Sequence, residues 1–391
     1  MPNIILDFLH EDPGLKLLFP DAEYFSFVQN PQYVATYPKI IPSQEIARIE
    51  FIAATSNATP PPNPIPTFMI IAPLYKCFYT WNGEINPQFC SILYEYFSIF
   101  VHIATNYQFE NILFFDTHAY QYDPNSIFAH YRLEELSKKI TFFKRNYANN
   151  VVYDKNVFPF PYIGSNEGGG AADAADGAPC VIDLLQKIIK LRKKSNYRFP
   201  NRNRLFFSGK PTNKKDTVYG TSTDCIEKLQ KIKNTVGEYL IYTEKMPDYD
   251  TYKIELSRTY FCLSLIEECG APTRRMFEIL STGTLLMCEA DNNARFMWNF
   301  EEDDFLAETY FVNETDLFAK LNYLGSNAKN YCRCLQKQNT LVDTYMNKNA
   351  LRRYIKKCCE RIIATVNIDD QILHFTSPAR AAPQKFETIK V

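Results

Sequence analysis

Short apolar runs alternate with amphipathic stretches along most of the chain. Residues 67–75 (TFMIIAPLY) and 111–120 (NILFFDTHAY) are nearly continuous apolar runs that predict buried strands. Between them, residues 87–107 are apolar over a length that predicts a helix. A strand, a helix and a strand in this order indicate a βαβ unit, and therefore a parallel sheet.

The pattern continues and then stops abruptly. Residues 132–148 are expected to form a further helix, followed by a strand at residues 150–154. Residues 165–179 (SNEGGGAADAADGAP) then offer mainly small and acidic side chains with nothing to bury. This composition predicts a flexible loop or an interdomain linker.

The second half repeats the alternation. Strands are expected at residues 204–209, 238–243, 260–266 and 284–289, with helices between them and mostly helices up to about residue 366. The predicted fold class is α/β, with two Rossmann-like domains facing each other across a cleft. The expected parts are an N-terminal domain at 1–164, a linker at 165–180, a C-terminal domain at 181–365, and a final segment at 366–391 that either packs back or is disordered.

The composition narrows the class of protein without identifying it. Of the 391 residues, 46% are hydrophobic and 22% are charged, as in folded globular proteins and unlike disordered chains. The formal net charge of -1 provides no overall attraction to polyanions, so nucleic acid is not an expected partner. The bias toward Asn, Lys, Ile, Tyr and Phe is typical of AT-rich genomes, both microbial and viral.

Targeting signals are not evident in the sequence. The start, MPNIILDFLHEDPG, lacks the features of a signal peptide, and the longest apolar run, residues 91–104, is too short to span a bilayer. A cytoplasmic protein is therefore expected, microbial or made by a virus in its host, with peripheral membrane contact left open. In that compartment the 11 cysteines are expected to be reduced. The oligomeric state is not predicted.

The junctions between strands and helices are the places to look for a ligand. In doubly wound sheets, ligands bind beyond the carboxyl ends of the strands, where loops meet helix N-termini. In the second half these junctions read FFSGKPTNKK, SLIEECGAPTRR and MCEADNNARF. Each of them has small residues or charges where a nucleotide would need them.

The second of these junctions carries a specific resemblance. Residues 256–291 resemble the donor-binding half of glycosyltransferases with GT-B architecture, in particular exostosin-like and group-1-type domains, and the likeness covers about residues 200–365. The upstream LFFSGK resembles the phosphate-contacting loop that opens the same domain. The matching positions are the apolar strand Phe261-Cys262-Leu263, Gly270 in the loop, Thr273-x-Arg275-x-x-Glu278 at the helix start, and Thr282-Gly283-Thr284 in the next turn.

This resemblance implies a metal-independent transferase that uses a nucleotide-diphosphate sugar as donor. Lys210 and Arg275 would bind the diphosphate, where negative charge develops on the leaving group. Gly209 would let the backbone approach a phosphate, and the helix N-terminus at Thr273 would add amide donors. Glu278, one turn after Arg275, would accept bonds from the ribose hydroxyls. The acceptor implied is a glycan, a glycoconjugate or another hydroxyl compound, bound on the N-terminal side.

Simpler interpretations compete with two of these assignments. Arg275 and Glu278 are three residues apart and could form a surface ion pair worth about 0.2–0.5 kcal/mol. The triplet DYD at residues 248–250 resembles the metal-binding Asp-x-Asp of other glycosyltransferases. It follows EKMP instead of an apolar strand, so Asp248 or Asp250 is interpreted as a helix N-cap and no metal site is expected.

A catalytic base, if the reaction uses one, is expected on loops of the first domain. Asp116 and His118 come at the end of the strand-like run FFDTHAY. Asp12 and Asp21 follow earlier apolar runs and are further candidates. Because a lone histidine is more often structural, the choice among these residues stays open.

Other functions remain as alternatives to a hexosyl- or pentosyltransferase. A Rossmann oxidoreductase is disfavoured because no Gly-x-Gly-x-x-Gly follows any predicted strand. A non-catalytic glycan-binding or structural protein on a transferase fold stays open, since Glu267 and Glu268 occupy a loop where exostosin-like proteins usually carry proline and glycine. The donor sugar, the acceptor and the stereochemical outcome are not determined by the sequence.

Overall fold

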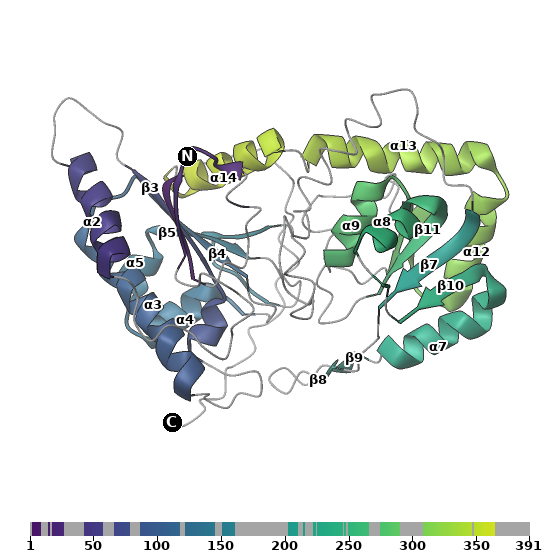
Figure 1. Cartoon of the computed structure of the whole chain (residues 1–391), viewed down its shortest axis with the longest axis horizontal. Helices are drawn as coiled ribbons and strands as arrows, with labels where there is room; N and C mark the ends of the chain where they lie inside the picture. Colours follow the sequence, from purple (N-terminus) through teal and green to yellow (C-terminus); the bar gives the residue numbers. More distant parts are fainter. Residues whose placement is uncertain are drawn as a thin grey trace.

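The computed structural model provides the geometry of most of the regular elements of the chain. It describes residues 2–8, 15, 18–26, 43–57, 66–78, 87–117, 122–144, 151–160, 202–209, 214–215, 222–223, 225–244, 246–247, 249–265, 274–289, 308–345 and 348–363. These residues form two lobes, each built on a parallel sheet (Figure 1).

The first sheet has six parallel strands in the order β2-β1-β3-β4-β5-β6. Helices between the strands belong to the same lobe (Figure 1). The strands are β1 (Pro2–Asp7), β2 (Glu23–Ser26), β3 (Thr67–Ala72), β4 (Asn111–Asp116), β5 (Ile140–Lys144) and β6 (Val157–Pro159). The helices are α2 (Ser43–Asn57), the 3-10 helix η2 (Leu74–Cys77), α3 (Pro87–Asn106), α4 (Pro124–His130) and α5 (Glu134–Ser137).

The second sheet has five parallel strands in the order β10-β7-β11-β12-β13. Its strands are β7 (Arg202–Ser208), β10 (Leu240–Thr243), β11 (Thr259–Ser264), β12 (Leu285–Glu289) and β13 (Tyr310–Phe311). A separate antiparallel pair is formed by β8 (Lys214–Lys215) and β9 (Ser222–Thr223). The helices are α7 (Cys225–Val236), the 3-10 helix η3 (Gly237–Tyr239), α8 (Tyr249–Arg258), α9 (Arg274–Thr282), α12 (Glu314–Gly325), α13 (Ala328–Tyr345) and α14 (Lys348–Ile363).

These sheets confirm the predicted α/β class with two Rossmann-like halves. Each sheet begins with the doubly wound order in which the second strand lies outside the first and the third lies on the first strand's other side. The βαβ unit predicted at residues 67–120 is β3, α3 and β4, and the four strands predicted in the second half are β7, β10, β11 and β12.

The helix predicted over residues 132–148 is wrong. The structure has only the short helix α5 there, followed by β5, and residues 151–154 form no strand. All five residues of β5 are buried because the strand lies inside the sheet with both faces covered. A continuous apolar run of this kind fits helical and strand spacing equally well.

Successive residues along the strands of the first sheet pack into two different hydrophobic cores, one on each face of the sheet. Ile4, Leu6 and Phe68 pack with α2, α3 and α4 on one face, in a cluster with many edge-to-face phenylalanine contacts. Ile5 and Met69 point to the other face, where they pack with residues of α14. This alternation is the period of two that a strand imposes on its side chains.

Helix α14 therefore belongs to the core of the first sheet, although it follows the second lobe in the sequence. Leu351, Ile355 and Cys358 are buried there, and the Tyr354 hydroxyl donates a 2.8 Å hydrogen bond to the Pro159 carbonyl oxygen. Figure 1 shows α13 lying along the second lobe and α14 along the first. The two helices connect the lobes.

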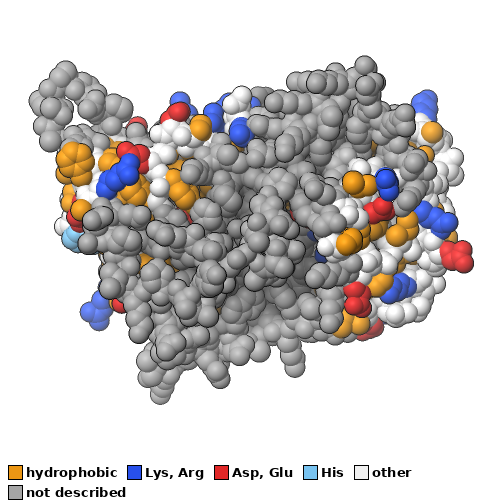
Figure 2. Space-filling view, in the orientation of Figure 1, with side chains coloured by type: hydrophobic (Ala, Val, Ile, Leu, Met, Phe, Trp, Pro, Cys, Tyr) orange, Lys and Arg blue, Asp and Glu red, His pale blue; other side chains and the backbone are white. Residues whose placement is uncertain are grey.

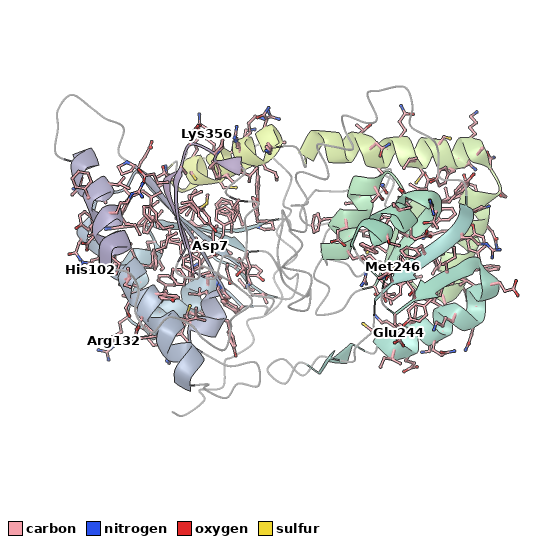
Figure 3. The ribbon with its side chains drawn as sticks, viewed as in Figure 1. Asp7, His102, Arg132, Glu244, Met246 and Lys356 are labelled. Atoms are coloured by element: carbon pink, nitrogen blue, oxygen red, sulfur yellow. The ribbon has the colours of Figure 1, made fainter. Side chains whose placement is uncertain are left out.

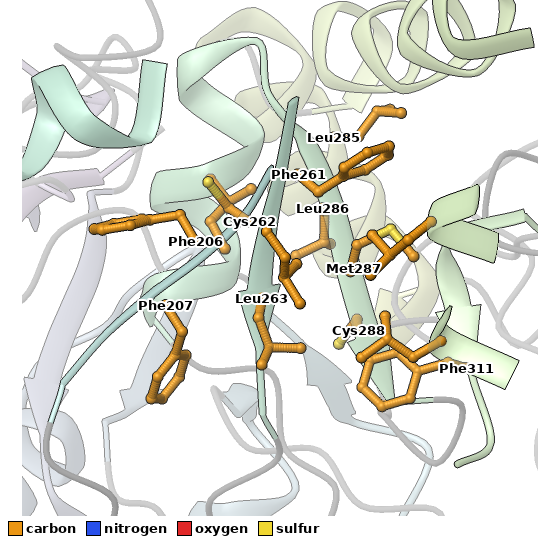
Figure 4. Close-up of a cluster of buried hydrophobic side chains, with 14 of the residues drawn as sticks. Phe206, Phe207, Phe261, Cys262, Leu263, Leu285, Leu286, Met287, Cys288 and Phe311 are labelled. Atoms are coloured by element: carbon orange, nitrogen blue, oxygen red, sulfur yellow. The ribbon is translucent and has the colours of Figure 1, made fainter. Parts of the chain in front are cut away.

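The core of the second lobe is built on consecutive apolar residues of β7, β11 and β12. Figure 4 shows Phe206, Phe207 and Phe261 with residues of β12 in this cluster. Burying a side chain of this size stabilises the folded state by about 1.5–3 kcal/mol. The eight cysteines with described thiols are all free, as expected for reduced residues. They are Cys77, Cys225, Cys262, Cys288, Cys332, Cys334, Cys358 and Cys359.

Candidate functional site

The topology of the second sheet indicates where a ligand would bind. In a sheet of order 2-1-3-4-5, the connections reverse direction between the first and the third strand, which here are β7 and β11. Ligands of doubly wound sheets lie beyond the carboxyl ends of the strands at this switch point. The residues that follow β7 and the helix that follows β11 are therefore the first place to examine.

Arg275 and Gly209 meet at this switch point. Gly209 follows β7 with a φ of 136°, and its amide donates a 3.0 Å hydrogen bond to the Thr243 carbonyl oxygen. Arg275 is the second residue of α9, and a Cβ atom placed on Gly209 would come within 2.4 Å of its Nη2 atom. The glycine thus leaves room for the guanidinium at the carboxyl end of β7.

Aromatic rings support this cation. The Arg275 guanidinium lies 4.6 Å from the centroid of the Phe207 ring, a distance at which cation–π attraction operates. Phe207 stacks on Tyr242 with 6.0 Å between ring centroids, and Lys233 Nζ lies 3.9 Å from the Tyr242 centroid. Two stacked rings near the ends of β7 and β10 therefore lie between two cations, with Arg275 against one ring and Lys233 against the other.

Glu278 lies one turn after Arg275 on α9. Its side chain is buried, which argues against the surface ion pair considered from the sequence. The Tyr252 hydroxyl donates a 3.2 Å hydrogen bond to Glu278 Oε2. Since α8 carries Tyr252 and α9 carries Glu278, packing of the two helices orients the carboxylate.

A third charged contact lies at the end of β12. Glu289 Oε1 is 2.7 Å from Lys228 Nζ of α7, and the lysine side chain is 40% exposed. The partial exposure leaves the pair accessible to solvent, so the pair contributes little stability at this edge of the sheet.

The carboxyl edge of the first sheet holds a buried ion pair. Asp116, the last residue of β4, lies 2.8 Å from Lys144 Nζ of β5, and both side chains are fully buried. The Tyr122 hydroxyl donates a 2.6 Å hydrogen bond to Asp116 Oδ2, and the Leu74 amide donates a 3.2 Å bond to Oδ1. A carboxylate enclosed by this many donors is suited to holding structure together, and its full burial leaves it out of reach of a substrate.

Burial changes the proton affinities around Asp116. Desolvation raises the pKa of the Tyr122 hydroxyl well above its ordinary value, and the nearby Asp116 charge raises this pKa further. Desolvation lowers the pKa of Lys144, while Asp116 opposes that change. The Lys144 ammonium also lies 3.8 Å from the centroid of the Tyr122 ring. The three side chains form one electrostatic unit.

A second carboxylate at this edge was not identified from the sequence. Asp7 ends β1 at the switch point of the first sheet, is fully buried, and accepts a 2.7 Å hydrogen bond from the Tyr24 hydroxyl. Figure 3 shows Asp7 inside the first lobe, whereas His102 and Arg132 lie at its outer side. The sequence does contain a signal for this residue, since an aspartate directly follows the apolar run IIL.

The remaining sequence candidates are unevenly placed. Asp21 is exposed, in the turn before β2. The structure therefore brings Arg275, Glu278 and Gly209 to one edge of the second sheet and Asp116 to the edge of the first. The candidates that lie outside the described residues are His118, Asp12, Lys210, Thr273 and Gly270.

Two further tests concern metals and membranes. Among the described side chains, no group of three or more His, Cys, Asp or Glu residues is placed to hold a metal ion. Of the helices described, none is long and apolar enough to cross a bilayer. On the face shown in Figure 2, the described Lys and Arg side chains are interspersed with Asp and Glu, in line with the net charge of -1.

Two doubly wound parallel sheets, with α13 along the second lobe and α14 along the first (Figure 1), define an α/β architecture of two Rossmann-like domains. No model of a protein family matches the sequence, and no curated protein sequence matches it either. An exostosin-like family membership is thus not established by comparison.

Among the solved structures similar to the chain are a trehalose-6-phosphate synthase, a glucosyltransferase and a glycosyltransferase. An α,α-trehalose-6-phosphate synthase from Burkholderia multivorans has 9% identity and a TM-score of 0.46, covering 95% of this chain and 100% of that one. An α-glucosyltransferase in complex with UDP-glucose and DNA containing an abasic site has 10% identity and a TM-score of 0.47, covering 91% and 98%. A glycosyltransferase from Rickettsia africae has 12% identity and a TM-score of 0.42, covering 93% and 90%.

TM-scores below 0.5 at such identities are too low to carry an argument about chemistry. The architecture therefore rests on the two sheets themselves, and the function on the residues at their edges.

Proposed function

We propose that the protein transfers a hexosyl or pentosyl group from a nucleotide-diphosphate sugar to a hydroxyl acceptor. The observation that carries the proposal is the Arg275 guanidinium held against Gly209 at the switch point, with the buried Glu278 carboxylate one turn later on the same helix. A cation and a carboxylate at this spacing match the diphosphate and the ribose of one nucleotide.

Arg275 would neutralise the diphosphate as the bond to the sugar breaks. A guanidinium presents two parallel N–H donors to phosphate oxygens and keeps its charge at any physiological pH. The stacked Phe207 ring restricts its rotation, so less conformational freedom is lost when a phosphate binds. Lys210, the next residue after Gly209, is proposed as a second cation, and the two together would do this without a metal ion.

Glu278 would accept hydrogen bonds from the ribose hydroxyls of the donor. The bond from Tyr252 engages Oε2 and contributes to the orientation of the carboxylate. A pre-oriented acceptor loses little entropy on binding, which favours a nucleotide over free phosphate. Thr273 and Gly270, from the matched motif, are proposed to complete this side of the site. The relationship to exostosin-like transferases is part of the same proposal.

The first lobe would bind the acceptor, a glycan or another hydroxyl compound. Its carboxyl edge carries Asp116, and His118 follows in the sequence two residues later. His118, Asp12 and Asp21 remain the proposed candidates for a base, whereas the contacts of Asp116 favour a structural role. A non-catalytic glycan-binding protein on the same fold is the alternative.

Nucleotide binding tests the proposal directly. UDP, GDP and ADP are titrated into the protein by calorimetry, followed by the variants Arg275→Ala and Glu278→Ala. Each substitution removes hydrogen bonds to or from a charged group, so the Kd of the preferred nucleotide is expected to rise about 10- to 100-fold. Arg258→Ala is the matched control, because Arg258 ends α8 directly before β11, at the opposite edge of the sheet.

The outcomes separate the candidate functions. Unchanged affinity in both site variants would refute the donor site. Tight nucleotide binding without hydrolysis or transfer from UDP-glucose or other nucleotide sugars, with glycans and a DNA duplex as acceptors, would favour the non-catalytic alternative. DNA is included because two of the similar structures contain it.

A further inference from the structure

The buried unit of Asp116, Lys144 and Tyr122 has no part in the donor site just described. Asp116 Oδ2 lies 2.8 Å from Lys144 Nζ and accepts a 2.6 Å hydrogen bond from the Tyr122 hydroxyl. All three side chains are essentially excluded from solvent. A charge pair in this position requires an explanation, because most cores of doubly wound sheets are filled by apolar residues alone.

The unit lies at the carboxyl ends of three neighbouring strands. Asp116 is paired in register with Ala72 of β3 on one side and with Lys144 of β5 on the other. Ala72, Asp116 and Lys144 are also the last residues of their strands. The ion pair therefore lies at the edge of the sheet where three neighbouring strands end.

Backbone groups of the segment after β3 are bound to this unit. The Leu74 amide donates a 3.2 Å hydrogen bond to Asp116 Oδ1, and the Tyr75 amide donates a 3.1 Å bond to the Tyr122 hydroxyl oxygen. Both amides belong to η2, the single 3-10 turn that follows β3. The path of the chain beyond β3 is thus fixed by side chains of two other segments.

The unit also links the end of β4 to the start of the next helix. The hydrogen bond between Tyr122 and Asp116 joins two residues six positions apart. Residues 118–121, which include the candidate His118, lie between these two residues in the sequence. The hydrogen bond therefore fixes Tyr122, two residues before α4, relative to the end of β4.

Stability alone does not account for these contacts. The cost of removing two charges from water can exceed their mutual attraction, and apolar residues of similar volume often stabilise a fold as well or better. What an ion pair with hydrogen-bonded neighbours adds is directionality: its partners are held at particular positions and angles. That property matters where loops must be placed accurately.

We propose that Asp116, Lys144 and Tyr122 are positioning residues for the acceptor side of the reaction, holding the start of η2 after β3, and the chain at Tyr122 ahead of α4, in place at the carboxyl edge of the first sheet. This inference rests on the proposed transferase function. It assigns no contact with substrate to the three residues themselves.

Hydrogen exchange and kinetics together test the proposal. Tyr122→Phe removes the hydroxyl that bonds Asp116 and Tyr75, and it keeps the ring beside Lys144. The double variant Asp116→Leu with Lys144→Met replaces the ion pair by apolar side chains of similar size. It is a second test that does not depend on whether Tyr122→Phe folds. Tyr354→Phe is the matched control, since it removes one buried tyrosine hydrogen bond on the opposite face of the same sheet.

Amide exchange is expected to rise about tenfold or more at residues 74, 75, 117 and 122 in both network variants, and not in Tyr354→Phe. With UDP-glucose as the probe donor, the turnover number per folded molecule is expected to fall about tenfold or more, while the Kd for UDP stays unchanged. A structural role alone would lower the folded fraction and leave turnover per folded molecule as it was.

Unchanged exchange at both segments would overturn the proposal, as would faster exchange with full turnover. If the wild-type protein binds no nucleoside diphosphate and turns over no nucleotide sugar, the proposed function fails. The exchange data would then still decide whether the unit holds the two segments.

Discussion

Arg275 and Gly209 fit each other so closely that neither can be changed without consequences for the other. The guanidinium lies over the Phe207 ring and beside the backbone of Gly209, with no room for a Cβ atom between them. Glycine also tolerates the φ of 136°, which other residues rarely adopt. The end of β7 is therefore shaped around a cation.

Gly209→Ala is expected to displace this cation. The new Cβ would come within 2.4 Å of Arg275 Nη2, so the guanidinium must move and the Kd for the preferred nucleoside diphosphate should rise about tenfold or more. Calorimetric titration measures this change. The matched control is Gly237→Ala, which also has a positive φ, of 54°, but no atom within 4 Å of its added Cβ. Equal affinity loss in both variants would contradict the proposed role of Gly209.

At the same scale, the sequence pointed to some residues of the proposed site and missed others. Arg275, Glu278 and Gly209 were singled out by the resemblance to GT-B donor-binding motifs at the junctions between strands and helices. Phe207 and Tyr242 did not, because an aromatic residue in an apolar strand has the same pattern whether it fills a core or supports a cation. The pairing of Asp116 with Lys144 depends on the register of two strands, 28 residues apart, which no local pattern contains.

At the scale of elements, length and flanking residues decided which predictions were right. The strands β3, β4, β11 and β12 were recognisable because turns or polar residues separate them from long helices. The strand β5 was not, since only the four-residue helix α5 and a two-residue turn precede it. Short elements carry too few periods for their spacing to be measured.

A buried side chain also supplies hydrogen bonds to backbone groups at the start of β12. Gln338 of α13 is fully buried, donates a 2.7 Å hydrogen bond to the Thr284 carbonyl oxygen, and accepts a 3.0 Å bond from the Leu286 amide. Its side-chain amide thus forms the two hydrogen bonds, one donated and one accepted, that the backbone of a neighbouring strand would form at the start of β12. Helix and strand are joined by polar contacts as well as by apolar packing.

Gln338→Leu is expected to lower the free energy of unfolding by about 2 kcal/mol or more, because a buried amide and a buried carbonyl lose their partner. Urea denaturation followed by circular dichroism measures the change. Gln336→Leu is the control: it makes the same substitution on the same helix at an exposed position. Similar stability of the two variants would show that the Gln338 contacts contribute nothing.

At the scale of the whole molecule, α14 makes the two lobes interdependent. It leaves the second lobe after α13 and supplies Leu351, Tyr354 and Ile355 to the core of the first sheet. Sequence patterns predicted a helix in this region and could not indicate which sheet it covers, because an amphipathic face specifies burial without naming the partner. The lobes in space therefore do not correspond to two consecutive stretches of the sequence, because α14 follows the second lobe and packs on the first.

Leu351→Ala is expected to destabilise the first lobe by about 2–5 kcal/mol, the usual cost of truncating a buried leucine. Thermal unfolding, with hydrogen exchange to locate the effect in β1, β3 and β4, measures it. Lys356→Ala on the same helix is the control, because that side chain is 70% exposed (Figure 3). Destabilisation confined to the second lobe would contradict the packing seen here.

The position of α14 also determines when the first lobe can be finished during synthesis. Arg352 donates a hydrogen bond to the carbonyl oxygen of Leu18, 334 residues earlier in the chain. At about 5–20 residues per second, a ribosome needs on the order of ten seconds or more to proceed from β6 to α14. For that time the nascent first sheet lacks the contribution of α14 to one apolar face. Synthesis that ends before α14 would therefore leave both lobes incomplete.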